Sequence, residues 1–426
     1  MKILVVGSGG REHAIIRKLK ESPQAPELYC ASGNGGISAD AVCVPLKPTD
    51  LDGITAWAEE NRPDLVFVAP DDPLVAGLVD RLGERGIPAF GPRANAAILE
   101  GSKVFSKELM KRYHIPTAAY EQFDNSADAI GYIARENKFP VVIKADGLAL
   151  GKGVIIAQTM QEAENAVVSI MEDKIFGASG NHIVIEEFLT GPEVSVLAFT
   201  DGHCVKPMVS SMDHKRALDG DEGLNTGGMG TVAPNPYYTP AVAAECMERI
   251  FLPTVEAMNK EGRPFKGCLY FGLMLTADGP KVIEYNCRFG DPETQVVLPL
   301  LKTDLLEIVQ AVVEERLSDL PIEWEDGAAA CVVAASGGYP QRYQTGYPIS
   351  GLDKNGQAAG VTVYHAGTAR DGDIYKTAGG RVLGVTAKGA TLEEALEKAY
   401  RAVDSIRFEG MHCRTDIGKR ALAASK

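Results

Sequence analysis

The sequence predicts a multidomain protein of mixed α/β and α+β class, and three observations support this. The 426 residues are too many for one hydrophobic core, so two to four domains are expected. Short apolar runs alternate with helical patterns over the first hundred residues, as in a βαβ domain with a parallel sheet. Later segments place neighbouring strands before a helix, which is typical of α+β units.

The first hundred residues form the predicted N-terminal βαβ domain. Three apolar runs have the length and composition of buried parallel strands, and three amphipathic stretches have the period of helices. Gly91-Pro92 marks the end of this pattern, so the domain is placed at 1–100. The strands are expected at Lys2–Val6, Leu28–Ala31 and Leu65–Ala69, and the helices at Arg11–Glu21, Leu51–Asn61 and Leu74–Gly86.

The middle of the chain changes character twice. A helix at Lys103–Tyr113 is followed by strands at Val141–Ala145, Val154–Gln158 and His182–Glu187. Thr159 and Glu162 have the spacing of a capping box for a further helix. The second part is expected to contain strands Glu193–Thr200 and Val205–Val209, a long polar loop Ser210–Pro236, helix Ala241–Asn259, a hairpin of Gly267–Thr276 with Lys281–Cys287, and helix Leu305–Leu317.

The last hundred residues form a small α+β unit after the linker Pro321–Gly327. Thr391 and Glu394 predict the start of its final helix by the same capping device. Strands are expected at Ala328–Ala335, Val361–Ala366 and Val382–Ala387.

Composition excludes several classes of function. The net charge is -14 with no run of Lys or Arg, which argues against nucleic acid as a partner. No apolar stretch reaches the roughly 20 residues of a membrane span, and the apolar start Met1–Val6 is too short for a signal peptide. The eight cysteines show no CxxC pair or zinc spacing, so we expect reduced thiols in a cytoplasmic protein.

Two glycine-rich segments could approach phosphates. Gly7–Ala14 follows a strand and opens a helix, where backbone N–H groups favour an anion. It lacks the third glycine of a dinucleotide site, because Glu12 occupies that position, so NAD is disfavoured. A small phosphate ligand and a turn needed only for packing both remain open. The second segment, Lys144–Gly153, is one residue short of a Walker A loop and precedes a strand. It fits either a lid over phosphates, with Lys144 on a rigid strand, or an ordinary hairpin turn.

Two further segments carry weaker signals. Glu186–Glu193 could offer backbone groups to a purine and a carboxylate to ribose, although glutamates near strand ends are usually solvated. Asp213–Arg216 and Asn225–Gly230 lie in the long polar loop, where side-by-side cations and exposed backbone donors suit a phosphate or carboxylate. A flexible surface loop that binds no ligand is the alternative.

Ile283–Asp291 is the most informative segment. On a strand, Glu284, Asn286 and Arg288 alternate to one face. A carboxylate and an amide oxygen two residues apart make a hard-oxygen site suited to Mg²⁺. Arg288 would then lie beside a phosphoryl group. A Glu284–Arg288 surface ion pair is the alternative reading.

The chain resembles the ATP-grasp superfamily in the order of four features. These are Lys144, the glycine-rich lid that follows it, the Glu-Glu-Phe-Leu linker and the Glu-x-Asn strand. The segments GSGGREHA, ADGLALGKGV, DHKR, NTGGMG and EYNCRFGDPETQ are similar to motifs of the phosphoribosylamine–glycine ligase (glycinamide ribonucleotide synthetase) family. The match runs from Gly7 to Gly418. It implies a Rossmann-like pre-ATP-grasp domain at 1–100, an ATP-grasp domain at 101–325 with a mobile lid subdomain at about 120–190, and a C-terminal domain at 326–426.

The resemblance also implies an activity. It is the ATP-dependent ligation of glycine to 5-phosphoribosylamine through glycyl phosphate, in purine biosynthesis, by a monomer with Mg²⁺ or Mn²⁺. Glu284 and Asn286 would bind the metal, and Arg288, Lys144 and Asp213 would be catalytic. The implied ATP contacts are Lys103, Lys144, Gly151, Lys152, Gly153, Glu186, Glu187, Leu189 and Glu193. The implied substrate contacts are Gly9, Gly10, Arg11, Asp71, Asp213, Lys215, Arg216, Asn225, Thr226, Gly227, Gly228, Met229, Arg288, Gly290 and Asp291.

Some positions depart from the family pattern. Asp71-Asp72-Pro73-Leu74 stands where Pro-Glu-x-Pro-Leu is usual, and Leu224 replaces a proline. Gly272 occupies the place where many ATP-grasp enzymes have an aspartate ligand, which implies two protein ligands for the metal. A ligase for another carboxylate, a carboxylase subunit and a non-catalytic nucleotide-binding regulator are the rival interpretations.

Overall fold

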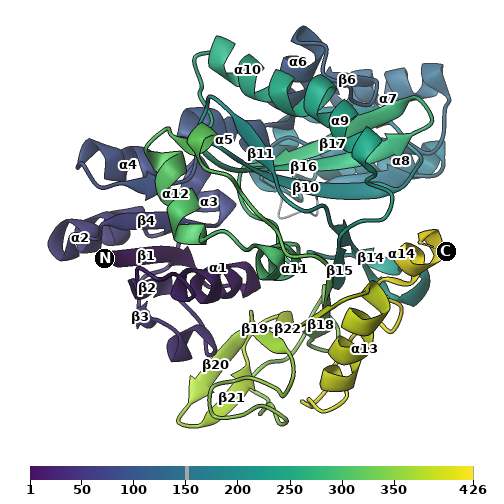
Figure 1. Ribbon diagram of the computed structural model, residues 1–426. Coiled ribbons are helices and arrows are strands. Elements are labelled where there is room, and N and C mark those ends of the chain that lie inside the picture. The colour runs from purple at the N-terminus through teal and green to yellow at the C-terminus, as the bar shows by residue number, and fades with distance from the viewer. Residues whose placement is uncertain (149–152, 426) are drawn as a thin grey trace.

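A computed structural model describes residues 1–148 and 153–425 (Figure 1). Residues 1–101 form a parallel five-stranded sheet in the order β3-β2-β1-β4-β5, flanked by helices, so the predicted βαβ domain is confirmed. Its strands are β1 (Lys2–Gly7), β2 (Glu27–Ser32), β3 (Val42–Val44), β4 (Leu65–Val68) and β5 (Ala89–Phe90). Its helices are α1 (Gly10–Lys20), α2 (Leu51–Asn61), α3 (Asp71–Val75), α4 (Leu78–Glu84) and α5 (Ala94–Gly101).

One helix of this domain was predicted wrongly. The single helix expected at Leu74–Gly86 is two short helices, α3 and α4. Gly77 separates them with φ of 87°, a left-handed conformation that interrupts a helix. The first of them, α3, begins at Asp71, shortly after the end of β4, so this residue lies at the carboxyl edge of the sheet.

Helix α6 (Lys103–Arg112) leads into a small unit with its own core. Its antiparallel sheet has the order β6-β9-β7-β8, and α7 and α8 cover it. The predicted N-cap of α8 is confirmed, since Glu162 N–H donates to Thr159 Oγ1 at 3.3 Å. The reciprocal bond of a capping box is displaced by one residue, because Glu162 Oε2 accepts from Gln158 N–H at 2.8 Å rather than from Thr159 N–H. The elements are β6 (Tyr120–Phe123), α7 (Ser126–Glu136), β7 (Val141–Ala145), β8 (Val154–Ala157), α8 (Met160–Met171) and β9 (Ile183–Glu187).

A second antiparallel sheet has the order β11-β10-β16-β17. The predicted hairpin is confirmed as β16 and β17. The helix expected at Ala241–Asn259 is α9 and α10 joined by a π-helical turn, Met247–Phe251. The elements are β10 (Glu193–Thr200), β11 (Val205–Pro207), α9 (Pro240–Cys246), α10 (Leu252–Lys260), β16 (Gly267–Thr276), β17 (Gly279–Asn286), α11 (Thr294–Val297) and α12 (Leu305–Val313).

The long polar loop expected at Ser210–Pro236 is wrong, because this segment contains four short strands. These are β12 (Met212–Asp213), β13 (Arg216–Leu218), β14 (Glu222–Asn225) and β15 (Gly230–Ala233). They have two to four residues each, too few to show a period, and β15 pairs with a strand about a hundred positions later, as in Gly230 opposite Val332. Pairing at this distance leaves no local signal in the sequence.

The C-terminal sheet therefore combines two parts of the chain, in the order β12-β15-β18-β22-β19. Only the last three of these strands lie within the proposed range 326–426. A hairpin of β20 and β21 and the helices α13 and α14 complete the unit. The elements are β18 (Ala328–Ala335), β19 (Thr362–His365), β20 (Thr368–Asp371), β21 (Ile374–Thr377), β22 (Arg381–Gly389), α13 (Leu392–Val403) and α14 (Lys419–Ala424).

Aromatic packing joins the N-terminal domain to the second sheet at the most informative segment. The ring of Phe289 lies 5.9 Å from those of Phe67 on β4 and Phe199 on β10, and 6.4 Å from that of Phe90. All four side chains are fully buried. Phe289 thereby anchors Arg288 and Asp291 at the domain junction, since its neighbours in sequence cannot move without disturbing this core.

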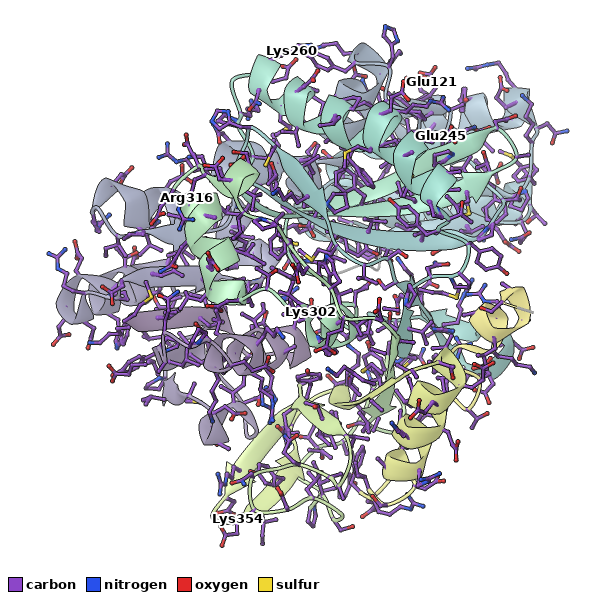
Figure 2. The ribbon with its side chains drawn as sticks, viewed as in Figure 1. Glu121, Glu245, Lys260, Lys302, Arg316 and Lys354 are labelled. Atoms are coloured by element: carbon purple, nitrogen blue, oxygen red, sulfur yellow. The ribbon has the colours of Figure 1, made fainter. Side chains whose placement is uncertain are left out.

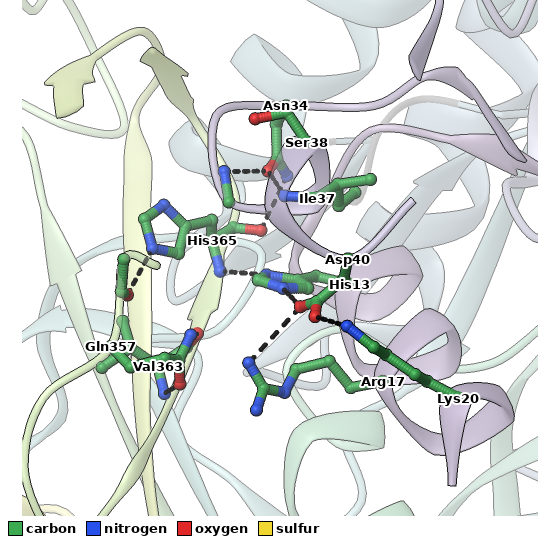
Figure 3. A network of polar contacts seen from close by, with 12 residues as sticks. His13, Arg17, Lys20, Asn34, Ile37, Ser38, Asp40, Gln357, Val363 and His365 are labelled. Carbon is green, nitrogen blue, oxygen red and sulfur yellow. Dashed lines mark hydrogen bonds and ion pairs between the residues drawn. The ribbon is translucent and has the colours of Figure 1, made fainter. Parts of the chain in front are cut away.

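A buried polar network joins the N-terminal and C-terminal domains (Figure 3). His365 N–H donates to His13 Nδ1 at 2.8 Å, and His13 Nε2 lies 3.1 Å from Asp40 Oδ2. Because Nδ1 accepts, Nε2 carries the proton and donates to Asp40. Asn34 Nδ2 also donates to His365 O at 2.8 Å. These bonds hold α1 against β19, which fixes the position of the α1 N-terminus.

Charged side chains such as Glu121, Lys260 and Lys354 point outward from the periphery (Figure 2). The eight cysteines are all free. In the described parts of the chain, no helix is both long and apolar enough to cross a membrane.

Candidate active site

A buried charge cluster links three strands on the side predicted to bind ATP. Lys144 on β7 and Lys107 on α6 each lie 3.0 Å from a carboxylate oxygen of Glu186 on β9. Lys144 Nζ also donates to Ile283 O on β17 at 3.0 Å. Glu186 Oε1 receives no well-directed hydrogen bond although it is buried. Although Lys144 Nζ lies 3.0 Å from it as an ion-pair partner, this oxygen can still accept a hydrogen bond from a ligand.

Lys107 is a residue that the sequence reasoning missed. Its Nζ donates to Thr117 Oγ1 at 2.8 Å, and burial lowers the pKa of Lys107 to about 8 despite the opposing charge of Glu186. Its position five residues before the end of α6 gave no signal, because a lysine in an amphipathic helix is normally solvated.

Lys103 lies at the start of α6, where its Nζ donates to Gly147 O at 2.8 Å. Ser102 Oγ caps the same helix and contacts Asp146 at 3.1 Å. These contacts join α6 to the first residues of the glycine-rich segment. Gly153 precedes β8, which pairs with β7 as predicted for a hairpin. Gly151 and Lys152 lie outside the described residues.

The linker after β9 leaves the core. Glu187 and Glu193 are exposed and Leu189 is half-buried. Glu187 accepts from Ala119 N–H at 2.9 Å, which lowers its pKa together with Lys281. Glu193 is the first residue of β10.

Glu284 and Asn286 lie on β17, as predicted. Partial burial would raise the pKa of Glu284, but Lys215, Lys144 and Lys103 outweigh it and lower the pKa to about 2. Lys215 Nζ lies 3.6 Å from Glu284 Oε1. Gly272 pairs directly opposite Glu284, so no third carboxylate stands there. No group of three His, Cys, Asp or Glu suited to a metal occurs within residues 1–148 and 153–425.

Arg288 does not pair with Glu284. Its Nη2 lies 3.3 Å from Glu100 Oε1 and donates to Asn286 Oδ1 at 3.1 Å. Burial would lower the pKa of Arg288, but Glu100 and Asp71 raise it. Burial in turn raises the pKa of Glu100 to about 7, against the charge of Arg288. Arg288 Nε is buried without a protein partner and can donate to a ligand.

Asp213 and Lys215 come from the segment that forms β12 and β13. Burial and the charge of Glu293 raise the pKa of the Asp213 carboxyl well above its usual range. Glu293 accepts from Tyr270 Oη at 3.1 Å. Arg216 differs from its neighbours, because its Nη1 donates to Gly223 O within the β13–β14 hairpin at 2.7 Å.

The segment Asn225–Gly230 forms a turn directly beside these residues. Thr226 Oγ1 donates to Lys215 O at 2.8 Å and accepts from Gly228 N–H at 2.9 Å. Gly228 has φ of 118°, and a Cβ there would lie 2.7 Å from Asp213 Oδ1. Met229 is fully buried and anchors the turn. Asn225 ends β14 opposite Arg216.

The N-terminus of α1 meets the turn after β17. Asp291 Oδ2 accepts from Arg11 N–H at 3.2 Å, and Arg11 Nη1 donates to Phe289 O at 3.0 Å. Glu12 Oε2 accepts from Gly9 N–H at 2.6 Å. A Cβ on Gly10 would lie 2.6 Å from Gln295 Nε2, and one on Gly290 would lie 2.4 Å from Glu293 Oε2, so both glycines permit close packing. Arg11 and Arg288 lower the pKa of Asp71 against the effect of burial.

The structure thus gathers most of the predicted residues around one site at the junction of the domains. The site has two parts. We name the two parts after the ligands that the resemblance implies for them. The group called the ATP part comprises Lys103, Lys107, Lys144, Glu186, Glu284 and Asn286. The group called the acceptor part, for glycine and phosphoribosylamine, comprises Asp71, Asp213, Gly227, Gly228, Arg288 and Asp291.

Family models match nearly the whole chain. Residues 1–100 match the N domain of phosphoribosylglycinamide synthetase, 101–294 its ATP-grasp (A) domain and 329–420 its C domain. The phosphoribosylamine–glycine ligase of Caldanaerobacter subterraneus subsp. tengcongensis is 49% identical over 98% of this chain and 99% of its own. The enzyme of the same name from Vibrio cholerae is 47% identical over 99% of both chains.

Solved structures agree with these matches. The crystal structure of phosphoribosylamine–glycine ligase from Thermotoga maritima has a TM-score of 0.86 and 33% identity, covering 98% of this chain and 100% of the other. A biotin carboxylase from Campylobacter jejuni has a TM-score of 0.76, with 97% and 92% coverage. At 16% identity, the second likeness concerns the fold alone.

Proposed function

This chain belongs to the phosphoribosylglycinamide synthetase family, and on that premise we propose that it ligates glycine to 5-phosphoribosylamine, with ATP converted to ADP and phosphate, in purine biosynthesis. The observation that carries the proposal is one site with two chemically different parts. Glu284 is ionised among lysines, as an ATP–metal site requires, and the Asn225–Gly230 turn meets it through Lys215. A regulator that had lost catalysis would have no need of both parts.

The oxygens of Glu284 and Asn286 would hold a divalent metal, either Mg²⁺ or Mn²⁺, and the low pKa of Glu284 keeps its oxygens free of protons. When bound, such an ion supplies positive charge against the phosphate oxygens. Lys144 and Lys103 add further positive charge on the same side. Glu284 and Asn286 would be the only two protein ligands proposed for this ion.

The purine would bind between the linker and Glu186. Glu186 Oε1 is buried and lacks a directed hydrogen bond, so it can accept from an exocyclic amino group. The backbone of Leu189 can face the purine edge, and exposed Glu193 can accept from ribose hydroxyls. Glu187, Gly151, Lys152 and Gly153 complete the proposed ATP contacts at the rim and the lid.

Phosphoryl transfer requires mainly positioning and neutralisation of charge. The glycine carboxylate oxygen attacks the γ-phosphorus, the bond to the β-phosphate oxygen breaks, and ADP leaves. The free Nε of Arg288 would donate to the transferring group, while Glu100 and Asn286 hold the other side of its guanidinium. The resulting glycyl phosphate is an activated acyl group.

The amine of phosphoribosylamine then forms the C–N bond, phosphate leaves, and the amine loses one proton to solvent or to the departing phosphate. Negative charge develops on the acyl oxygen during this attack. Asp213 would act in this step, since its carboxyl group borders the acceptor part beside Gly228. The sugar phosphate would be contacted by Asp71, Arg11, Gly9 and Gly10. The rest of the acceptor part would be formed by Lys215, Arg216, Asn225, Thr226, Met229, Gly290 and Asp291.

The test is ADP release from the purified protein with ATP, a divalent metal and each substrate in turn. We expect release only when glycine and 5-phosphoribosylamine, formed in the assay from ribose 5-phosphate and ammonia, are both present. Bicarbonate in place of glycine tests the carboxylase alternative. Release that needs bicarbonate, or needs neither substrate, would contradict the proposal. We further propose a monomeric cytoplasmic protein, which sedimentation analysis and cell fractionation can test.

A further inference from the structure

An arginine of the C-terminal domain reaches into the acceptor part of the site. Arg381 begins β22, and its side chain is mostly buried. Its Nη1 donates to Gly227 O at 2.8 Å and to Asp291 O at 2.7 Å, with Gly228 O at 3.5 Å. One guanidinium nitrogen therefore joins the Asn225–Gly230 turn to the turn that follows Arg288.

The packing around this contact is close. A Cβ on Gly227 would lie 2.9 Å from Arg381 Cζ, so the guanidinium rests directly on the glycine backbone. Tyr339, also from the C-terminal domain, accepts from Gly227 N–H at 3.1 Å through its hydroxyl oxygen. Both polar groups of the Gly227 main chain are thus held by C-terminal side chains.

The contact continues into the N-terminal domain. Arg381 Nη1 lies 3.4 Å from Asp291 Oδ1, and the other oxygen of Asp291 accepts from Arg11 N–H. Gln295 Nε2 donates to Asp291 Oδ1 at 2.8 Å. Burial would raise the pKa of Asp291, but Arg381 and Arg11 lower it, so the pair is charged. A mostly buried charged pair constrains geometry strongly, because separating its partners leaves an uncompensated charge.

We propose that Arg381 is a positioning residue for the acyl-acceptor part of the reaction. It holds Gly227–Gly228 against Asp291, so that Asp213 and Arg288 face one space. The inference rests on the proposed function and goes beyond it, because it makes the C-terminal domain a part of the catalytic unit. Arg381 contacts backbone oxygens and Asp291 rather than the reacting atoms.

The experiment compares Arg381→Ala and Arg381→Lys with the matched control Arg401→Ala, an exposed arginine of α13 paired with Glu397. Lys keeps the charge and can restore one of the contacts. Because Arg381→Ala removes the charge-assisted hydrogen bonds to Gly227 O and Asp291 O, we expect KM for glycine or phosphoribosylamine to rise at least about tenfold. KM for ATP should stay within about twofold, with Arg381→Lys intermediate and Arg401→Ala like the wild type.

Hydrogen exchange gives a readout that does not depend on activity. In Arg381→Ala, the amides of residues 225–230 and 289–293 should exchange faster, while those of β7 and β9 stay protected. If the wild type has no ligase activity but Arg381→Ala still shows faster exchange at these two turns, the positioning role is kept and the proposed function is rejected. Unchanged exchange at both turns, or an equal rise of KM for ATP and for the acceptor substrates, would overturn the proposal. If Arg381→Ala does not fold, Arg381→Lys carries the same two comparisons.

Discussion

The ATP part and the acceptor part of the site are built in different ways. The core of the ATP part lies on regular strands, because Lys144, Glu186 and Glu284 come from β7, β9 and β17. Lys144 forms an ion pair with Glu186 and donates a hydrogen bond to the Ile283 backbone, next to Glu284. The acceptor part consists of turns drawn from three regions of the chain, and Arg381 and Asp291 hold these turns together. We infer that nucleotide binding depends on a rigid local frame, whereas acceptor binding depends on how the domains meet.

The largest expected effect is at the metal position. Glu284→Ala should abolish turnover, with a loss of at least about a thousandfold, because two protein ligands are reduced to one and Lys215 loses its partner. Steady-state ADP release measures the loss, and circular dichroism checks that the protein stays folded. Activity like that of the wild type would remove Glu284 from the metal site.

The next largest effect is expected at Lys107, whose substitution should impair ATP binding but not glycine binding. In Lys107→Gln the amide keeps a hydrogen bond to Glu186 but not the charge, so Glu186 is held less firmly. KM for ATP should rise about tenfold while KM for glycine stays within about twofold. Lys111→Gln, on the last turn of the same helix, is the control. A rise in KM for glycine alone would show that the Lys107–Glu186 pair does not belong to the ATP part.

The domain junction behind the acceptor part should be sensitive to acid. Burial lowers the pKa of His365 to about 3 and that of His214 to about 4, and it also lowers that of His13. These imidazoles are neutral when folded but take up protons near pH 6.5 when unfolded. Their contribution to stability is therefore complete above pH 6.5 and is lost as the pH falls toward 4, by up to about 1.4 kcal/mol per pH unit for each imidazole.

Urea unfolding at pH 7 and pH 5 tests this expectation. His365→Gln should show a smaller loss of unfolding free energy between the two pH values than the wild type. His203→Gln, at an exposed site, should not differ from the wild type. An equal pH dependence in all three proteins would exclude the buried imidazoles as its source.

The smallest expected effect concerns the unit that contains the glycine-rich segment. Thr159→Ala removes the cap of α8 and should lower the unfolding free energy by about 1 kcal/mol. Because this unit has its own core, KM for glycine should not change. Thr391→Ala, at the equivalent cap of α13, compares the same loss in the C-terminal domain. A larger loss of ligase activity in Thr159→Ala than in Thr391→Ala would mean that the α8 cap also positions the substrate.

The two parts also differ in how far the sequence predicted them. Strands β7, β10, β16 and β18 lie where their apolar runs placed them, and Glu284 and Asn286 share a strand as expected. Lys107, Glu100 and Arg381 were missed, because each acts through a partner more than seventy positions away. Of the four short strands of 210–236, β15 was missed for the same reason, because it pairs with the distant β18. Strands β13 and β14 pair with each other, and with three and four residues they are too short to show a period.

The most direct test of the two-part account is Mg·ATP binding, measured by calorimetry, to Glu284→Gln and Asp291→Asn. The account predicts that Glu284→Gln weakens binding at least about tenfold, whereas Asp291→Asn binds Mg·ATP within about twofold of the wild type and loses affinity for the acceptor substrates. Equal loss of Mg·ATP binding in both variants would contradict it, because the two parts would then form one inseparable site.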